Sequence, residues 1–239
     1  MGTTLLELRT EILEPIDALE AISDNDDAMY SVDEVNRYIN KGIKKAQSLI
    51  LSIYEDYFLS YSNISIVSGT AAYDLPTDIF ANKLRKILYD DGSDEYIVRR
   101  IKKLEETMDF ESAEDYKFLI TNTLTNGVQI NIYPTPDFTD ATSMKWFYIR
   151  DAKVLSLDTD EIDIPEFKDI VVLYARRECL KKRMNAPMLA ECKQELNNEI
   201  TLMIDTLSSM ILDEDNSIEI DTSFYDDFDN NGFGGNYGY

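Results

Sequence analysis

The chain has no histidine and only two cysteines among its 239 residues. The missing histidine excludes Ser-His-Asp and Cys-His catalysis and every histidine-based metal site. Cys179 and Cys192 lie far apart, belong to no CxxC motif and cannot make a structural zinc site by themselves. We expect both to be buried, small apolar side chains of a protein kept in a reducing, intracellular environment.

Basic residues are also scarce: 23 Lys and Arg face 46 Asp and Glu, a formal net charge of −23. Such a chain is repelled by a phosphate backbone unless its basic residues cluster, and it carries no recognised DNA-binding motif. The clusters can be solvated faces with ion pairs, which we favour, or docking strips for acidic partners. They are Lys83, Arg85 and Lys86; Arg99, Arg100, Lys102 and Lys103; and Arg176, Arg177, Lys181, Lys182 and Arg183.

No long apolar run is present: the longest, Ile170–Ala175, is far too short to span a membrane, and the start does not resemble a secretory signal. A P-loop motif is absent as well. The acidic clusters Asp24–Asp27 and Asp158–Asp163 lack the glycine and glutamate of a calcium loop, so we expect turns or helix caps there. The sequence therefore predicts no enzyme, no catalytic residue, no metal and no cofactor.

Helical signals come from both ends of the chain. Residues 4–22 have helical periodicity, with a break expected at Pro15, and Ser31 with Glu34 forms a capping box before a helix to about residue 58. Pro165 opens a helix over Glu166–Met184, and Asn185-Ala186-Pro187 separates it from a last helix. The apolar stripe of that helix is Leu189, Cys192, Leu196, Ile200, Met203, Ile204, Leu207 and Ile211.

The middle of the chain has strand signals. A short helix is expected at Leu104–Asp109, a two-residue hairpin turn at Asn126-Gly127, and a strand end at Pro134 and Pro136. The predicted strands are Ile64–Val67, Lys86–Tyr89, Tyr96–Ile101, Phe118–Thr121, Val128–Tyr133, Met144–Arg150 and Val154–Leu157.

Together these signals predict an α+β fold: an antiparallel helical bundle formed by both chain ends, an inserted small antiparallel β domain, and an extended C-terminal arm. The predicted parts are the first half of the bundle at 1–62, the β-rich insertion at 63–157, the second half of the bundle at 158–212 and an acidic, Gly- and Tyr-rich arm at 213–239.

Aromatic residues gather near the second helix and in the arm. Tyr54, Tyr57, Phe58, Tyr61 and Tyr73 could stack on single-stranded nucleic acid, but in an acidic chain we favour core and interface roles. The arm has acidic residues, no Lys or Arg, and six aromatics. We expect it to be mobile in the free subunit and to order on a partner groove. The six aromatics are Phe224, Tyr225, Phe228, Phe233, Tyr237 and Tyr239.

One segment carries a resemblance to a known family. A long amphipathic helix that ends in Tyr54-Glu55-Asp56-Tyr57-Phe58 is followed by ISIVSGTAAYDLPTDI, residues 64–79. That order resembles the head–tail adaptor, or connector, proteins of short-tailed bacteriophages, over roughly residues 5–215. The SGTAAYDLP stretch is the specific part; the remainder matches in the order and type of elements.

The resemblance implies a structural virion protein without catalytic residues. Such adaptors form rings, usually of twelve copies, beneath the portal protein and join it to other tail proteins such as a nozzle, hub or fibres. Double-stranded DNA then passes an acidic lumen without specific binding. The arm aromatics are the candidate contacts to the portal or a neighbouring subunit, and Arg99, Arg100, Lys102 and Lys103 the candidate electrostatic subunit interface.

Two other functions stay open at this stage: a tail terminator, stopper or other tail-tube ring, and a non-viral scaffold. A ring of about twelve copies would favour the adaptor, six a terminator, and no ring a scaffold. A tail-associated hydrolase is disfavoured by the absence of histidine and of any nucleophile motif.

Overall fold

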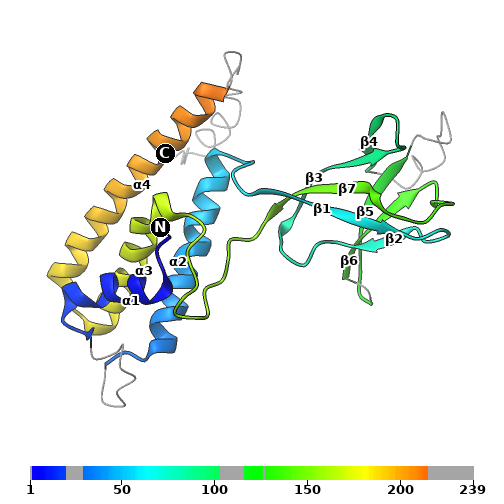
Figure 1. Cartoon of the computed structure of the whole chain (residues 1–239). Helices are drawn as coiled ribbons and strands as arrows, with labels where there is room; N and C mark the ends of the chain where they lie inside the picture. Colours follow the sequence, from blue (N-terminus) through cyan, green and yellow to red (C-terminus); the bar gives the residue numbers. More distant parts are fainter. Residues whose placement is uncertain (1, 20–28, 103–115, 126, 215–239) are drawn as a thin grey trace, which may run out of the picture.

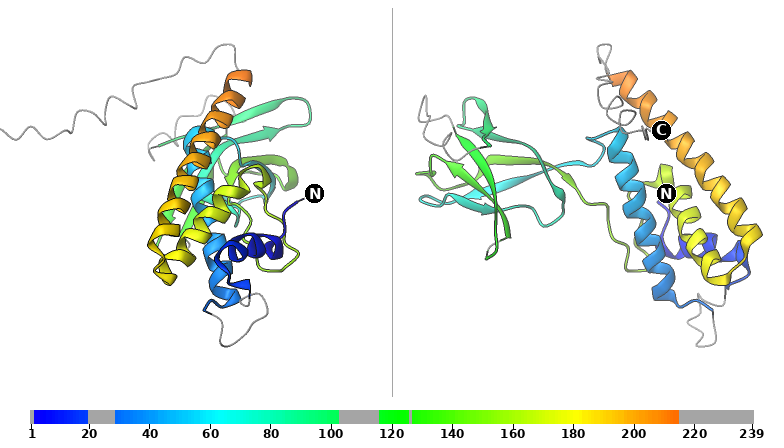
Figure 2. Two further views of the ribbon diagram at one scale, coloured as in Figure 1. Left: turned by 90° about the vertical axis from the view of Figure 1, so that its left-hand side faces the viewer. Right: turned by 180° about the vertical axis from the view of Figure 1, so that it is seen from behind.

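The computed structural model describes residues 2–19, 29–102, 116–125 and 127–214. Helices and a curled sheet form two parts that lie side by side and are joined by the long strands β1 and β7 and the segment after β7 (Figures 1 and 2). The helical elements are α1 (Leu5–Leu13), η1 (Glu14–Ile16), α2 (Val32–Ile53), η4 (Pro165–Phe167), α3 (Lys168–Arg183) and α4 (Ala186–Glu214). The strands are β1 (Leu59–Ile66), β2 (Ala72–Asp74), β3 (Ile79–Asp90), β4 (Glu95–Arg100), β5 (Lys117–Thr123), β6 (Gly127–Tyr133) and β7 (Asp140–Arg150).

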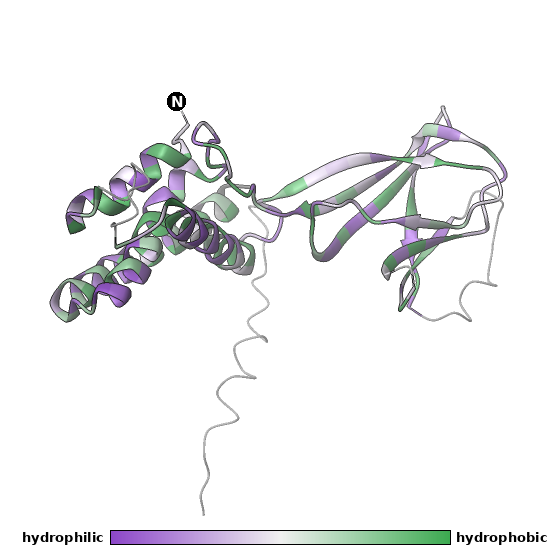
Figure 3. Cartoon of the chain, turned by 90° about the horizontal axis from the view of Figure 1, so that it is seen from below, coloured by the Kyte–Doolittle hydropathy of each residue, from purple (hydrophilic) through white to green (hydrophobic). Residues whose placement is uncertain are grey.

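The fold is α+β, as predicted, and each part has its own hydrophobic core. The first core takes buried side chains from α1, α2, α3 and α4 together with Phe58, Ile149 and Leu155. The second core lies inside the sheet and includes Ile64, Ile87, Phe118 and Trp146. Hydrophobic and hydrophilic residues alternate along the elements of both parts (Figure 3), as half-buried helices and strands require.

The helix boundaries follow local sequence chemistry. Thr4 and Glu7 form a capping box at α1, with the Glu7 carboxylate accepting from the Thr4 N–H at 2.8 Å. The break expected at Pro15 is confirmed: α1 ends at Leu13, a 3-10 turn holds Pro15, and Asp17 takes a left-handed φ of 49°.

The start of α2 at Ser31 is confirmed, because the Ser31 hydroxyl accepts from the Glu34 N–H at 3.2 Å. The reciprocal half of that capping box is replaced: Glu34 accepts from the Tyr38 hydroxyl and from Lys182 instead. The helix also ends five residues before the predicted residue 58, at Ile53, and Tyr54 is extended. The chain turns there so that Phe58 enters the helical core and β1 begins.

The sheet order is β1-β7-β3-β4-β5-β6-β2. The prediction of an antiparallel β domain was wrong in one respect: β4 and β5 pair in parallel, with Arg99 opposite Lys117, so the sheet is mixed. A parallel pair needs a long crossover, and residues 101–116 supply it. The predicted helix Leu104–Asp109 in that crossover lies outside the described residues.

Two further local predictions were changed by the structure. Val154–Leu157 is not a strand, because its backbone bonds go to side chains: the Leu155 N–H donates to Asn40 Oδ1 at 2.8 Å. The turn between β5 and β6 spans 124–126 rather than two residues, since Thr123 pairs with Gly127; Asn126 itself lies outside the described residues. The strand end before Pro134 is confirmed.

The boundaries of the last two helices agree with the prediction. Pro165 opens the 3-10 turn before α3, and Met184 ends α3 in a left-handed conformation before Asn185. Cys192, Leu196, Met203 and Leu207 are buried along α4, as the predicted stripe requires, whereas Ile204 is 41% exposed. Within the part of the chain that the structure describes, none of the helices has the length and apolar character to cross a bilayer.

Candidate interaction surfaces

The adaptor-like segment SGTAAYDLP folds as a turn closed by its own tyrosine. Gly69 has a φ of +79°, and its N–H donates to the Pro136 carbonyl at 2.8 Å. The Tyr73 hydroxyl donates to the Thr70 carbonyl at 2.8 Å and accepts from the Val67 N–H at 3.2 Å. The segment therefore holds β1 and β2 together at the far end of the sheet.

The junction between the two parts is held by charged side chains. Arg85 lies 2.8 Å from the Glu55 carboxylate and 2.6 Å from that of Asp56, and Lys83 also reaches Glu55. A bulge in β3, where Ala81 and Asn82 both have positive φ, carries these basic residues across to the turn after α2. The pairs are half exposed, so each stabilises the junction by at most about 1 kcal/mol.

Arg150, at the end of β7, makes a second set of contacts at the junction. Its guanidinium lies 2.6 Å from the Asp163 carboxylate and 5.3 Å from the centre of the Phe58 ring. The buried Gln47 side chain donates to the Arg150 carbonyl at 2.9 Å. These contacts join α2, β7 and the segment before α3.

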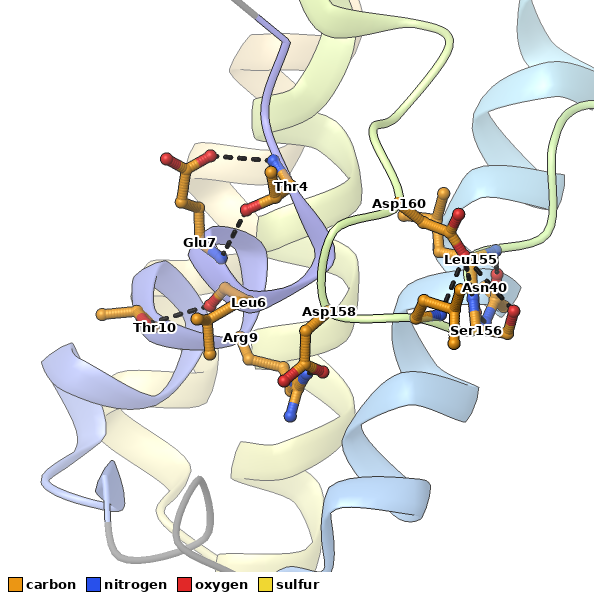
Figure 4. Close-up of polar contacts among 11 residues, drawn as sticks. Thr4, Leu6, Glu7, Arg9, Thr10, Asn40, Leu155, Ser156, Asp158 and Asp160 are labelled. Carbon is orange, nitrogen blue, oxygen red and sulfur yellow. Dashed lines mark hydrogen bonds and ion pairs between the residues drawn. The ribbon is translucent and has the colours of Figure 1, made fainter.

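The acidic cluster Asp158–Asp163 has a structural role, as predicted (Figure 4). Asp158 pairs with the buried Arg9, and Asp160 accepts from the N–H groups of Leu157 and Ser156 at 2.8 Å each. Those two backbone groups, and then Lys153, hold the pKa of Asp160 well below its usual range. No group of metal-ligating side chains occurs among the residues that the structure describes, and Asp24–Asp27 lies outside them.

The basic cluster 176–183 is used inside the subunit. Arg176 donates to the Glu11 carbonyl at 2.8 Å, and Arg183 donates to the Ile16 carbonyl, so α3 is tied to α1 and η1. Lys182 lies 2.6 Å from Glu34. Burial opposes ionisation of Glu34, but hydrogen bonds from Lys182 and Tyr38 outweigh it and lower its pKa. The interpretation as ion pairs is supported for this cluster.

Arg99, Arg100 and Lys102 are placed differently. All three are exposed at the end of β4 and after it, and within the described ranges none of them forms a side-chain ion pair. Neighbours in a strand point to opposite faces, so Arg99 and Arg100 do not form one patch. Lys103 lies outside the described residues, as do the arm aromatics Phe224, Tyr225, Phe228, Phe233, Tyr237 and Tyr239.

The aromatic residues near α2 mostly have packing roles. Phe58 is buried, Tyr54 and Tyr57 pack on the helical core, and Tyr73 packs on the core of the sheet. Tyr61 is the exception, with 69% of its surface exposed. It contacts Phe147, with ring centres 6.0 Å apart.

Tyr61 belongs to a surface that the sequence analysis did not identify, which we call the outer sheet face. Directly opposed residues share a face, and the register gives one row of Tyr61, Phe147 and Lys86 and a second of Asn63, Lys145, Leu88 and Ile97. Arg99 continues the same side of β4. Lys86 lies 4.7 Å from the Phe147 ring centre, and Ile97 is 70% exposed. The alternation of residues along each strand was the signal in the sequence for this face. The sequence did not show which distant strands pair, so the face could not be predicted.

Both cysteines are buried and free, as predicted. Burial raises the pKa of the Cys179 thiol to about 12 and also raises that of Cys192. The carbonyl of Cys179 accepts from the buried Tyr30 hydroxyl at 2.8 Å. These thiols are therefore packing groups of the helical core.

The family model described as SU10 adaptor protein matches residues 3–216, nearly the whole chain. The chain belongs to the SU10 adaptor protein family, and the resemblance to phage head–tail adaptors is confirmed. A search of curated proteins gave no match.

Family membership places the chain among structural components of the phage virion that associate with other head or tail proteins, and it suggests a non-enzymatic role. The SGTAAYDLP segment that carried the resemblance in the sequence lies well inside the matched residues.

Proposed function

We propose that this chain is the subunit of a head–tail adaptor ring, of about twelve copies, that sits under the portal, joins capsid to tail and forms part of the DNA ejection channel. The family match over residues 3–216 is the observation that carries this proposal. The helical part, drawn from both ends of the chain, and the sheet part give each copy two different side surfaces. A closed ring needs such a heterologous contact.

The charge distribution supports a role around passing DNA. The formal net charge is −23, and within the described residues the 176–183 cluster is engaged in contacts of its own subunit. An acidic lumen would not retain a polyanionic genome as it moves through. Within the described residues Arg99, Arg100 and Lys102 form no ion pair, and we propose that they attract an acidic surface of a neighbouring copy.

We propose that the arm, residues 213–239, contacts the portal or a neighbouring copy through its aromatics. The arm offers ring anchors without basic residues or a continuous apolar stripe, so its ordering would depend on a partner. The remaining surfaces of the ring would meet the tail proteins below it.

The test is a binding experiment with the purified chain and a recombinant portal of the same phage. Sedimentation should show a ring of the chain and a complex with the portal, and a single-particle class average should count the copies. Deleting residues 214–239 should leave thermal unfolding nearly unchanged and abolish stable portal binding. Portal binding at full affinity by the truncated chain would assign the contact to the helical part or the sheet, and a six-fold ring would favour a terminator.

A further inference from the structure

Strand β1 is an edge of the sheet, and nothing in its composition protects it. Its sequence, Leu59–Ile66, contains no charged residue and no proline, the usual means by which edge strands are blocked. A bulge between Ile64 and Ile66 disrupts only the far end. Within the described sheet, the stretch from Leu59 to Asn63 is therefore a regular edge without charge or proline, beside the outer sheet face.

The hydrogen-bond register identifies the free groups of this edge. The Arg150 N–H donates to the Phe58 carbonyl at 3.0 Å, which makes that pair hydrogen-bonded to β7. Antiparallel bonding alternates, so the backbone groups of Ser60 and Ser62 point to β7, whereas those of Tyr61 and Asn63 point away from it. In the described part of the chain, β7 is the strand that pairs with β1, so the backbone groups of Tyr61 and Asn63 face the open edge of the sheet.

A segment outside the described residues has the alternating sequence of a strand. Residues 217–224, SIEIDTSF, alternate Ile218 and Ile220 with Glu219 and Asp221, the period-two pattern of a strand with one apolar face. The segment is eight residues long, and so is β1. Its acidic residues would lie on the same face as Lys145 of β7, the strand that neighbours β1.

We propose that residues 217–224 of one copy add as an extra strand to the β1 edge of a neighbouring copy. Main-chain hydrogen bonds to Tyr61 and Asn63 would supply affinity, and side-chain alternation would supply specificity. The isoleucines would face the core side next to Ile64, and the acidic side chains would lie on the outer face near Lys145. This inference rests on the proposed ring, because an exchanged strand is a heterologous contact that closes around it. It leaves Tyr225 and the later aromatics for the portal.

The proposal predicts that cysteines on the same face of the two paired strands form a disulfide and that cysteines on opposite faces do not. A loose contact would not give this difference. Full-length Asn63→Cys is mixed with full-length Glu219→Cys or Asp221→Cys and oxidised mildly with oxidised glutathione. One of these pairs should give a disulfide-linked dimer, enriched about tenfold over the control, because pairing raises the effective concentration of the two thiols. Ile220→Cys is the matched control, because its side chain would lie on the opposite face of the added strand, away from Asn63→Cys. The native thiols are buried and stay unreactive.

A proline exchange tests the backbone bonds separately. Asn63→Pro removes an N–H that points to the free edge, which an edge strand tolerates, and should abolish cross-linking between Tyr61→Cys and the acidic positions. Ser62→Pro removes an inward N–H and should instead disturb the buried Trp146 fluorescence.

Equal yields from all pairs would refute the added strand. Two results would overturn the assignment of residues 217–224 of a neighbouring copy to the β1 edge. One is a disulfide that forms only within a single copy of a chain carrying both Asn63→Cys and Glu219→Cys. The other is a disulfide that forms only between two Asn63→Cys copies. Rings that form and bind the portal without any such cross-link would overturn this inference while leaving the proposed function standing. Absence of rings for the unmodified chain would overturn the proposed function itself.

Discussion

Substitution of Gly69 gives a direct measure of backbone strain in the adaptor-like turn. Gly69 has a φ of +79°, in the region that side-chain-bearing L-residues rarely adopt. A Cβ built on it meets no heavy atom within 4 Å, so steric overlap with neighbours contributes nothing. Its N–H, which donates to the Pro136 carbonyl at 2.8 Å, is kept by any residue other than proline. The effect of a substitution is therefore conformational alone.

The expected magnitudes follow from that geometry. Gly69→Ala should lower the free energy of unfolding by about 1–2 kcal/mol, the cost of a left-handed conformation for an L-residue. Gly69→Val should cost about 2–3 kcal/mol, because a β-branched side chain adds crowding against its own backbone. Gly69→Asn should be the mildest change, since asparagine tolerates this region. Tyr73 closes the turn and prevents it from relaxing to another backbone conformation.

The unfolding of the sheet can be measured separately from that of the helical part. Trp146 is the one tryptophan of the chain and is buried in the core of the sheet, so its fluorescence during urea unfolding reports that part. A loss of 1 kcal/mol should lower the melting temperature by about 2–4 °C for a protein of this size. Equal midpoints for wild type and Gly69→Val would refute the reasoning. Asparagine as harmful as valine would show that space, rather than φ, limits this position.

Four other perturbations have defined outcomes. Arg99→Glu with Arg100→Glu should weaken association with neighbouring copies or the portal, and added salt should weaken the wild type likewise; sedimentation unchanged at low and high salt would contradict this. Asp160, whose pKa is lowered, contributes stability above the unfolded value of about 3.9 that is lost as pH falls toward the folded pKa, so the acid side of the stability profile should flatten in Asp160→Asn. With its pKa raised to about 12, Cys179 should resist iodoacetamide at pH 8 in the folded chain and react after unfolding; mass spectrometry distinguishes these results. A Cβ at Gly42 would lie 3.2 Å from the Val171 carbonyl oxygen, so Gly42→Leu should destabilise the helical part by about 1–3 kcal/mol, and unchanged helical melting by circular dichroism would contradict that contact.

The local chemistry of the chain was readable from the sequence. Ser31 starts α2, Pro15 ends α1, and Pro134 ends β6, because each of these residues acts through its own backbone or through a bond to a residue three positions away. The burial of both cysteines and the structural role of the acidic cluster before α3 followed from composition and position. The family itself could be recognised from one short segment, SGTAAYDLP, and its place after a long helix.

Tertiary structure decided what depends on distant partners. The parallel pairing of β4 with β5, the loss of a strand at Val154–Leu157 to the side chain of Asn40, and the early end of α2 all arise from contacts between segments far apart in the chain. The same holds for the surfaces: the basic cluster near Arg176 is engaged by α1, whereas the outer sheet face exists only because β1, β7, β3 and β4 lie side by side. A sequence states which side chains alternate, but strand register alone decides which of them meet on one face.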